Sequence, residues 1–554
     1  MSKIQYGVCF LLSFIFPVFM GYVQIFSGGM FSLPFAFLLG VMMAVVYAVQ
    51  QKFSGKLIVR GMFILLIVFF LSGKCFDFSY DGQAYHQEAA YNLASGWNPV
   101  WDGADDVDLL TETYPKALWL YAGMWYSVTG NLLVGKAYNI ILALAAILFI
   151  NNILKEVLGS GRKNVRIGIT LLLVFNPVVL AQLFSYYNDG TVYLLLILLS
   201  ATIYLGFFSK DEFLSKNIAS MLLITLLAIL CNTKFTGVVY AGAFSFFTMI
   251  ALWLKKRKDI YRRVAGILSA GLILGILVIG FNPYVTNTIR HGHPFWPLLG
   301  ANTIDIITQH EHPDFLKQNR IVKLVWSQLA EMRSKALFDR KEAAETYGLP
   351  RIKIPGEIKK QELLIAMSED PRIGGFGPWF NIVFLLGLAS LVVAAKKKIF
   401  SKIEWLLLVG ILTSVLLNPE CWWARYAPQF YLFPILTLLF FIYRRNCSYR
   451  WCVILLLPVI INILLVAAPV LAKQVVFEYR FSRDMNKIER AANETGCPIP
   501  VVFTDFSVDR ITCFEQRGIP YDIVDESTIS PIEEPMFISG THKKILVYSL
   551  DDFQ

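Results

Sequence analysis

The sequence predicts an α-helical polytopic membrane protein, and three observations support this fold class. Of the 554 residues, 56% are hydrophobic and only 16% are charged, which is too apolar for a soluble multi-domain chain. Apolar runs of about 18 or more residues recur, the length of a helix that crosses a bilayer. Counting these runs predicts about 13 spans. Basic clusters fall on every second connection, as they do in cytoplasmic loops.

These basic clusters set the expected topology of the chain. They lie at residues 52–60, 155–166, 255–263, 396–402 and 444–450. The first apolar run, 6–26, has no convincing cleavage site and is read as a retained helix with a cytoplasmic N-terminus. An odd number of spans then places the C-terminal tail outside. The net charge of +10 is explained by the inside loops and anionic membrane lipids, so no nucleic-acid partner is expected.

Two domains are expected. Residues 1–472 form the transmembrane domain, with external loops at about 76–131 and 282–377. Residues 473–554 form a small external α/β module, with strands at 500–503 and 544–548 and a helix at 509–517. Cys497 and Cys513 both lie in this tail and could form a disulfide. The chain has no CxxC motif, which argues against a zinc site.

The first external loop opens with the candidate catalytic acid, Asp81, in the stretch Tyr80-Asp81-Gly82-Gln83-Ala84-Tyr85-His86. A helical pattern follows and stops at Gly96. The alternative interpretation is that Asp81 only caps this helix, because Asp is a preferred N-cap residue. The loop ends at Tyr114-Pro115-Lys116, and the Trp- and Tyr-rich residues 117–128 predict a helix lying at the membrane interface.

A second acid, Asp189, follows in the short external connection Ser185-Tyr186-Tyr187-Asn188-Asp189-Gly190. Asn-Asp-Gly is also a good turn sequence, so the residue has a purely structural alternative. The functional interpretation depends on topology, because Asp189 and Asp81 are predicted on the same side of the membrane. The two acids would then share one external pocket.

A third external region combines aromatic and basic residues. The loop after residue 282 contains His291-Gly292-His293-Pro294-Phe295-Trp296-Pro297, and residues 321–367 predict a charged amphipathic helix. Arg425 stands at the outer end of a span, beside Trp423 and Tyr426. It is either a snorkelling cation in an aromatic belt or a ligand for phosphate, which arginine can bind in bidentate geometry.

The order of these motifs resembles the GT-C superfamily of membrane glycosyltransferases. The stretches 80–86 and 96–99 resemble its first external loop, Tyr114-Pro115-Lys116 resembles the start of its interfacial helix, and Asn188-Asp189 resembles its second-loop acid. Residues 291–297 are similar to a Gly-Asn-Pro-aromatic-x-Pro stretch in bacterial members, and 423–426 to their Trp-x-Arg-Tyr. The resemblance covers most spans but not the C-terminal module. Its aminoarabinose and protein-mannosyl branches both serve as comparisons.

This resemblance implies an inverting transfer of a sugar from a polyprenyl-phosphate donor to a glycan, lipid or protein acceptor. The transfer would take place on the outer, periplasmic face of a bacterial inner (plasma) membrane. Asp81 would be the general base, and Arg425 and Lys116 would bind the departing phosphate. Asp189 would orient the acceptor or hold a divalent cation, which is the one cofactor considered. The remaining expected substrate-binding residues are Tyr85, His86, Tyr187, His293 and Tyr426.

Two other functions stay open. A lipid-linked glycan polymerase or ligase also works externally on polyprenyl carriers. Its pyrophosphate substrate would, however, require more external arginines than the sequence offers. A transporter or flippase would carry charged residues along a path through the bilayer. The spans hold few of them, such as Lys136 and Lys234 near helix ends, which favours the transferase.

Overall fold

The chain forms a helical bundle in a computed structural model that describes residues 2–103, 107–211, 213–305, 311–333, 348–503, 508–525, 536–538 and 545–547. The first elements are α1 (Ser2–Phe26), α2 (Leu33–Gln50), α3 (Gly55–Lys74), the π-helical turn η1 (Gly82–His86), α4 (Gln87–Ala94), α5 (Leu109–Thr113), α6 (Ala117–Thr129), η2 (Leu132–Ala137), α7 (Tyr138–Leu158), α8 (Lys163–Val174), α9 (Pro177–Gln182) and α10 (Asp189–Phe207).

The central elements are α11 (Lys216–Cys231), α12 (Phe235–Leu254), α13 (Lys258–Ile273), η3 (Leu274–Val278), η4 (Phe281–Val285), α14 (Thr286–His291), α15 (Pro313–Leu316), α16 (Arg320–Leu329) and α18 (Lys360–Ile365). The last elements are α19 (Phe380–Lys396), α20 (Lys402–Leu417), η7 (Pro428–Tyr431), α21 (Leu432–Arg445), α22 (Tyr449–Thr495), β1 (Ile499–Phe503), α23 (Val508–Arg517), β2 (Tyr521–Ile523), β3 (Met536–Phe537) and β4 (Ile545–Val547).

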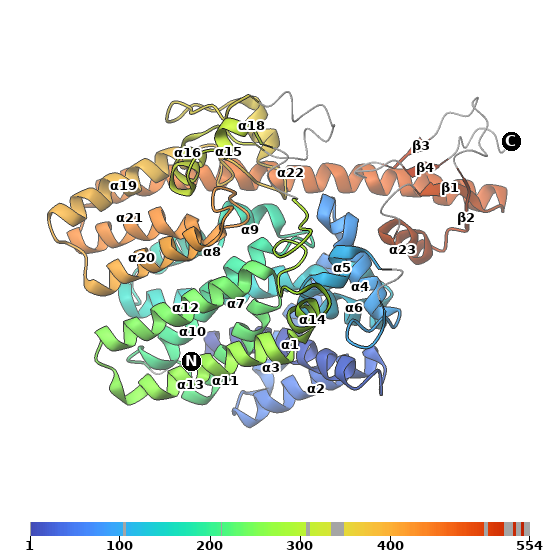
Figure 1. Cartoon of the computed structure of the whole chain (residues 1–554), viewed down its shortest axis with the longest axis horizontal. Coiled ribbons are helices and arrows are strands. Elements are labelled where there is room, and N and C mark those ends of the chain that lie inside the picture. The colour runs from blue at the N-terminus through green and yellow to red at the C-terminus, as the bar shows by residue number, and fades with distance from the viewer. Residues whose placement is uncertain are drawn as a thin grey trace.

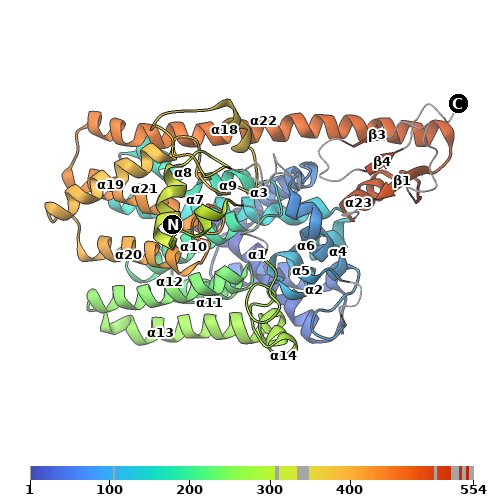
Figure 2. The ribbon, with the colours of Figure 1, turned by 45° about the horizontal axis from the view of Figure 1, so that its top comes forward.

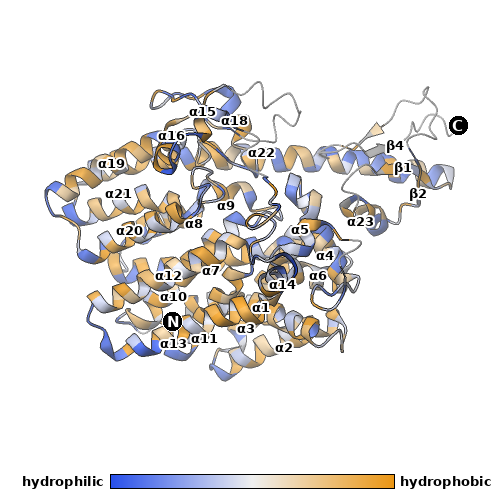
Figure 3. Ribbon diagram, in the orientation of Figure 1, coloured by the Kyte–Doolittle hydropathy of each residue, from blue (hydrophilic) through white to orange (hydrophobic). Residues whose placement is uncertain are grey.

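Eight helices among the described residues are long and apolar enough to cross a membrane, and Figure 3 shows the apolar character of the bundle. They are 3–26, 33–50, 55–74, 132–158, 189–207, 235–254, 258–278 and the long helix 449–495. The chain is therefore an α-helical protein of membrane-embedded character. The larger count of about 13 spans stays a prediction, because several expected crossings, such as α8 and α21 with 12 and 14 residues, are shorter than the ~20 residues that a helix needs to span a bilayer.

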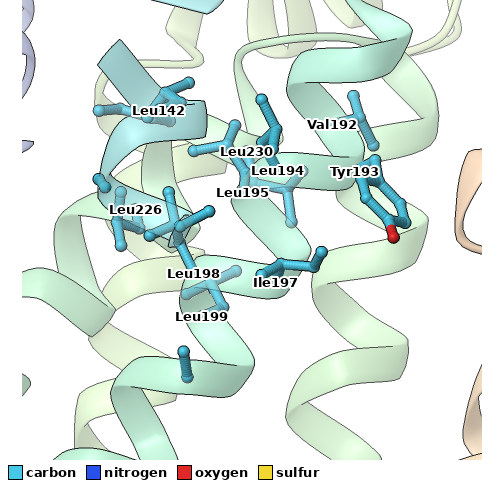
Figure 4. Close-up of a cluster of buried hydrophobic side chains, with 14 of the residues drawn as sticks. Leu142, Val192, Tyr193, Leu194, Leu195, Ile197, Leu198, Leu199, Leu226 and Leu230 are labelled. Carbon is cyan, nitrogen blue, oxygen red and sulfur yellow. The ribbon is translucent and has the colours of Figure 1, made fainter. Parts of the chain in front are cut away.

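The helix that begins at Asp189, α10, lies in the interior of the bundle. Its Leu194 and Leu198 are almost completely buried, as are Leu226 and Leu230 of α11 and Leu142 of α7. Figure 4 shows these side chains converging between the helices. A helix that is apolar on all sides is buried in a protein core or in a membrane, and α10 is buried mainly by its neighbouring helices. Asp189, as its first residue, is consequently held by a rigid element.

The expected helix at 117–128 is present as α6, in which every residue from Ala117 to Met124 is buried and which packs against α4 and α1. Its position at the membrane interface stays a prediction. The second expected helix differs from the structure. Instead of one amphipathic helix over 321–367, the described part of that stretch holds two short helices, α16 and α18. The residues 348–359 between them are not helical.

The longest helix, α22, connects the bundle to a small C-terminal sheet. It has 47 residues and runs along one side of the bundle to the strands at its far end (Figures 1 and 2). The strand order is β2-β1-β4-β3, with β1 parallel to β2 and antiparallel to β4. Strands and helix α23 thus lie close to their predicted positions. The expected boundary at residue 473 falls inside α22, and Cys497 and Cys513 are both free thiols.

Candidate functional site

The first acid, Asp81, is paired with Arg425. Arg425 donates from Nη1 to Oδ2 of Asp81 at 2.9 Å, and the two side chains are 9% and 18% exposed. Asp81 immediately precedes η1, but its carboxylate forms no capping bond to that turn. The interpretation of Asp81 as a helix cap alone is therefore wrong. Its side chain is instead held by a cation from the loop between α20 and η7.

Arg425 is itself anchored by a residue that sequence reasoning missed. Its Nε lies 3.0 Å from Oδ1 of Asp370, whose Oδ2 is 3.0 Å from Nη2 of Arg372. The backbone N–H of Arg425 also donates to the carbonyl of Pro371. Burial opposes the charge on Arg425, but Asp370, Tyr426 and Asp81 outweigh it and hold its pKa above the ordinary value. Arg425 is thus a fixed, fully charged group between two carboxylates, not a snorkelling belt residue.

The second acid, Asp189, forms an ion pair with Lys234, the residue before α12. Gln182, the last residue of α9, donates from Nε2 to Oδ2 of Asp189 at 3.1 Å, and its Oε1 accepts from the N–H of Gly190 at 2.7 Å. The same Nε2 reaches the carbonyl of Glu369 at 2.9 Å. Asp189 is 1% exposed. It is therefore a structurally fixed acid and not the exposed tip of an Asn-Asp-Gly turn.

Two tyrosines join the two ion pairs. The guanidinium of Arg425 lies 4.8 Å from the ring centre of Tyr187 and 5.0 Å from that of Tyr426. The ammonium of Lys234 lies 4.2 Å from the ring centre of Tyr426. Cations over aromatic faces are stabilised electrostatically. The structure therefore brings Asp81 and Asp189 from separate loops to one aromatic wall, with Tyr187 and Tyr426 where the sequence led us to expect them.

The charges of this cluster balance. Its described ion pairs join three carboxylates to three cations. The carboxylates belong to Asp81, Asp189 and Asp370, and the cations to Arg425, Arg372 and Lys234. Desolvation lowers the pKa of Lys234, and Asp189 opposes this effect. An anionic ligand that entered the site would thus compete with carboxylates for cations that are already oriented.

Tyr85 and His86 stand beside Asp81 on η1. The Tyr85 ring packs on His86, with centroids 4.3 Å apart. His86 is buried, and its Nδ1 accepts a hydrogen bond from Nε1 of Trp119 at 2.6 Å. Burial lowers the pKa of His86 to about 3, although Asp81 opposes the shift. His86 is therefore neutral at physiological pH and orients its neighbours without exchanging a proton.

Lys116 and His293 lie differently from the expectation. The ammonium of Lys116 is buried and donates to the carbonyls of Glu112 and Tyr114 at 2.8 and 2.6 Å. Burial holds its pKa well below the ordinary value, so it closes the turn before α6 and is a poor ligand for a leaving phosphate. His293 accepts from the N–H of Phe295 at 3.1 Å within its own loop. Its described contacts do not reach either acid.

A divalent cation finds no prepared site at Asp189. Within the described ranges there is no group of three or more His, Cys, Asp or Glu side chains that could hold a metal. The two carboxylate oxygens of Asp189 are engaged by Lys234 and Gln182. Lys234 thereby supplies the positive charge that a metal would supply at this position.

The residues that sequence reasoning missed share one weak signal. Asp370 and Arg372 flank Pro371 shortly before the span-like helix α19, and Gln182 ends a short helix before the Asp189 loop. Polar residues adjoining spans on the expected external side are candidates for such a cluster. Nothing in the sequence indicates which of the many polar residues in the long loop meets Arg425.

No family model, curated protein or solved structure matches this chain.

Proposed function

We propose that the chain is a membrane glycosyltransferase. It would move a sugar from a polyprenyl-phosphate donor to an envelope glycan, lipid or protein acceptor on the outer face of a bacterial inner membrane. Asp81 would act as the general base. The observation that carries the proposal is the Asp81–Arg425 pair, in which a partly accessible carboxylate is held by a buried guanidinium that Asp370 fixes from behind.

The chemistry requires a base and a cationic environment in one place. The acceptor hydroxyl or amine attacks the anomeric carbon and gives its proton to Asp81 as the new bond forms. The bond between that carbon and the phosphate oxygen breaks, and the phosphate leaves with the electron pair. A positioned carboxylate contributes roughly 10²–10⁴-fold to such a step. Fixed cations that face the developing phosphate charge supply the complementary stabilisation.

The cations suited to this role are Arg425 and Lys234. Arg425 has five N–H donors. One donor on Nη1 goes to Asp81 and one on Nη2 goes to Tyr426, while Nε makes an ion-pair contact with Asp370. The other donors on Nη1 and Nη2 are the ones that would reach a phosphate oxygen. Lys234 replaces Lys116 in our assignment, because its ammonium stands over the shared Tyr426 ring. Asp189 orients Lys234, because its two carboxylate oxygens are engaged by Lys234 and Gln182.

The position of the cluster at helix ends favours a lipid-linked donor. Asp189 opens α10, and Lys234 directly precedes α12, both of which are candidate spans. Polar groups gathered where apolar helices end suit a substrate whose phosphate is polar and whose tail stays in hydrocarbon. A soluble nucleotide sugar has no need of such a location.

One observation keeps a second candidate in view, a lipid-linked glycan polymerase or ligase. Arg372 shares Asp370 with Arg425, and its guanidinium lies 4.4 Å from the ring centre of Trp423. A second guanidinium beside the first suits a pyrophosphate, which carries more charge than a monophosphate. A transporter or flippase has no comparable observation in its favour.

Mass spectrometry of lipids and envelope glycans tests the proposal. Cells expressing the wild-type chain, the Asp81→Asn variant or no copy of the gene would be compared. Loss of one sugar from the envelope together with accumulation of a sugar-bearing polyprenyl monophosphate supports the transferase, whereas accumulation of a diphosphate carrier supports the ligase. Asp259→Asn is the matched control, because Asp259 also pairs with an arginine, Arg257, but at the exposed start of α13. Unchanged lipids and glycans in the cells without the gene would refute both functions.

A further inference from the structure

A buried arginine from the C-terminal segment reaches the loop that carries Asp81. Arg510 of α23 is 2% exposed. Its Nη2 donates to Oε1 of Gln83 at 2.7 Å, and its guanidinium lies 5.4 Å from the ring centre of Phe76. Gln83 is the second residue of η1, two positions after Asp81. The C-terminal segment, by which we mean the end of α22 from Gln474 together with the sheet and α23, therefore contacts the turn that follows Asp81.

Gln83 also belongs to a buried network of hydrogen bonds around Asp77. Its Nε2 donates to the carbonyl of Asp77 at 2.8 Å. The Asp77 carboxylate accepts from the N–H groups of Ser79 and Tyr186 at 2.9 and 2.8 Å. Tyr186 precedes Tyr187 and the Asp189 loop. One network thus ties α23 to both loops that carry the acids.

The residues of this hydrogen-bond network are closely packed. Gly82 lies directly against Asp77, and a Cβ at that position would overlap the Asp77 carboxylate and the Ser79 hydroxyl. The turn after Asp81 therefore has one preferred arrangement. Close packing of this kind transmits a small displacement of Gln83 to its neighbours.

The long helix α22 fixes the other side of the same loop. Glu478 accepts a hydrogen bond from the N–H of Phe76 at 2.9 Å, and Gln474 donates one to the carbonyl of Phe76 at 3.0 Å. The Phe76 ring stacks on Phe481 with centroids 4.1 Å apart. Asp81 consequently lies between two points of the loop that the C-terminal segment holds, Phe76 and Gln83.

We propose that Arg510 is a positioning residue that holds Gln83, and through it the Asp81 carboxylate, in register with Arg425. The C-terminal segment then contributes to the site by positioning the loop that carries Asp81. A guanidinium is costly to bury, since an apolar side chain would pack there without losing hydration. Its hydrogen bond to Gln83 is a specific polar contact that core packing alone does not explain. The effect on turnover rests on the proposed function, whereas the effect on the loop does not.

Hydrogen exchange measured by mass spectrometry on the purified full-length protein tests the effect on the loop. Arg510→Met keeps an unbranched stem against Phe76 and removes the bond to Gln83. Loss of a hydrogen bond to a charged group is expected to speed exchange of the amides in residues 78–86 on the order of 10-fold. Arg510→Lys keeps the charge with one point donor and should give a smaller effect.

Arg517→Ala is the matched control. Arg517 lies on the same helix, but it bonds to Asn486 and Glu489 of α22 and not to the first loop. It should leave exchange in 78–86 at the wild-type rate. Exchange in 508–517 reports whether α23 remains folded in each variant. If α23 is intact in Arg510→Met and 78–86 exchanges as in the wild type, the proposal is overturned. If α23 unfolds in Arg510→Met, the same comparison of exchange in residues 78–86 is made between Arg510→Lys and the wild type, and wild-type exchange in Arg510→Lys then overturns the proposal.

Transfer assays separate this inference from the proposed function. Arg510→Met should lower kcat about 10-fold or more with a smaller change in KM, because Asp81 is misplaced while the donor site is untouched. Arg517→Ala should retain wild-type kcat. Wild-type turnover by Arg510→Met would overturn the positioning role even if the loop loosens. Absence of any transfer by the wild-type protein would refute the proposed function and leave the exchange result to judge the contact.

Discussion

Arg425 donates a 2.9 Å hydrogen bond to Asp81, joining residues 344 positions apart in the chain. The bond connects the loop between α3 and η1 to the loop between α20 and η7. It also turns an expected phosphate ligand into a group that holds the proposed general base. Three of our predictions follow from this pair and its neighbours, and the fourth concerns His86.

Asp81→Asn should abolish transfer and leave stability close to that of the wild type. Asparagine retains an oxygen that accepts from Arg425, but it cannot take a proton, so turnover should fall by roughly 10²–10⁴-fold. The measurements are sugar transfer to acceptor and thermal unfolding in detergent. Full turnover by this variant would remove Asp81 from the mechanism.

Arg425→Lys should be strongly impaired. A single ammonium cannot reproduce the fork that contacts Asp81 and Asp370 at 2.9 and 3.0 Å. We expect kcat to fall on the order of 10²-fold as Asp81 loses its orientation, with weaker donor binding as well. Steady-state kinetics and a donor-binding assay separate the two effects. Normal kinetics combined with a lower unfolding temperature would return Arg425 to the aromatic-belt interpretation.

Lys234→Met and Asp189→Asn should each destabilise the fold more than the two changes together. Either single change leaves one charge without its partner in the interior, which costs roughly 3–5 kcal/mol for a buried pair. The double variant removes both charges and should recover part of this loss. A double-mutant cycle on the free energy of unfolding measures the coupling. Simple additivity would mean that the ion pair contributes nothing specific.

His86 should make the protein less stable as the pH falls below neutrality. Its pKa is lowered to about 3 in the fold, against about 6.5 in an unfolded chain, so the unfolded state binds the proton first. His86 therefore does not lower the free energy of unfolding above pH ~6.5, but it lowers this free energy progressively from there toward pH ~3. The loss in the free energy of unfolding between pH 7.5 and 5 is about 2 kcal/mol.

The check is thermal unfolding of the wild type and of His86→Gln across this range. Glutamine can still accept the bond from Trp119 at this position but does not titrate. The wild type should therefore lose stability relative to the variant as the pH is lowered. Parallel curves for the two proteins would show that His86 is already protonated or exposed in the fold.

The sequence determined the features that depend on local composition. Apolar runs indicated the membrane-embedded helices, and the change of composition in the tail predicted β1, β4 and α23 near their observed positions. It also singled out Asp81, Asp189 and Arg425, because an ionisable residue beside an apolar helix is costly and seldom incidental. These properties are set by a residue and its near neighbours along the chain.

The tertiary structure decided which of these groups meet. Lys116 and Lys234 are both lysines beside apolar helices, yet one turns to backbone carbonyls and the other to Asp189. Asp370 reaches Arg425, and Arg510 reaches Gln83 across 427 positions. Such contacts depend on how helices pack and where long loops return, which no local pattern specifies. Burial then sets the charge states, because the cost of desolvating a group depends on everything that surrounds it.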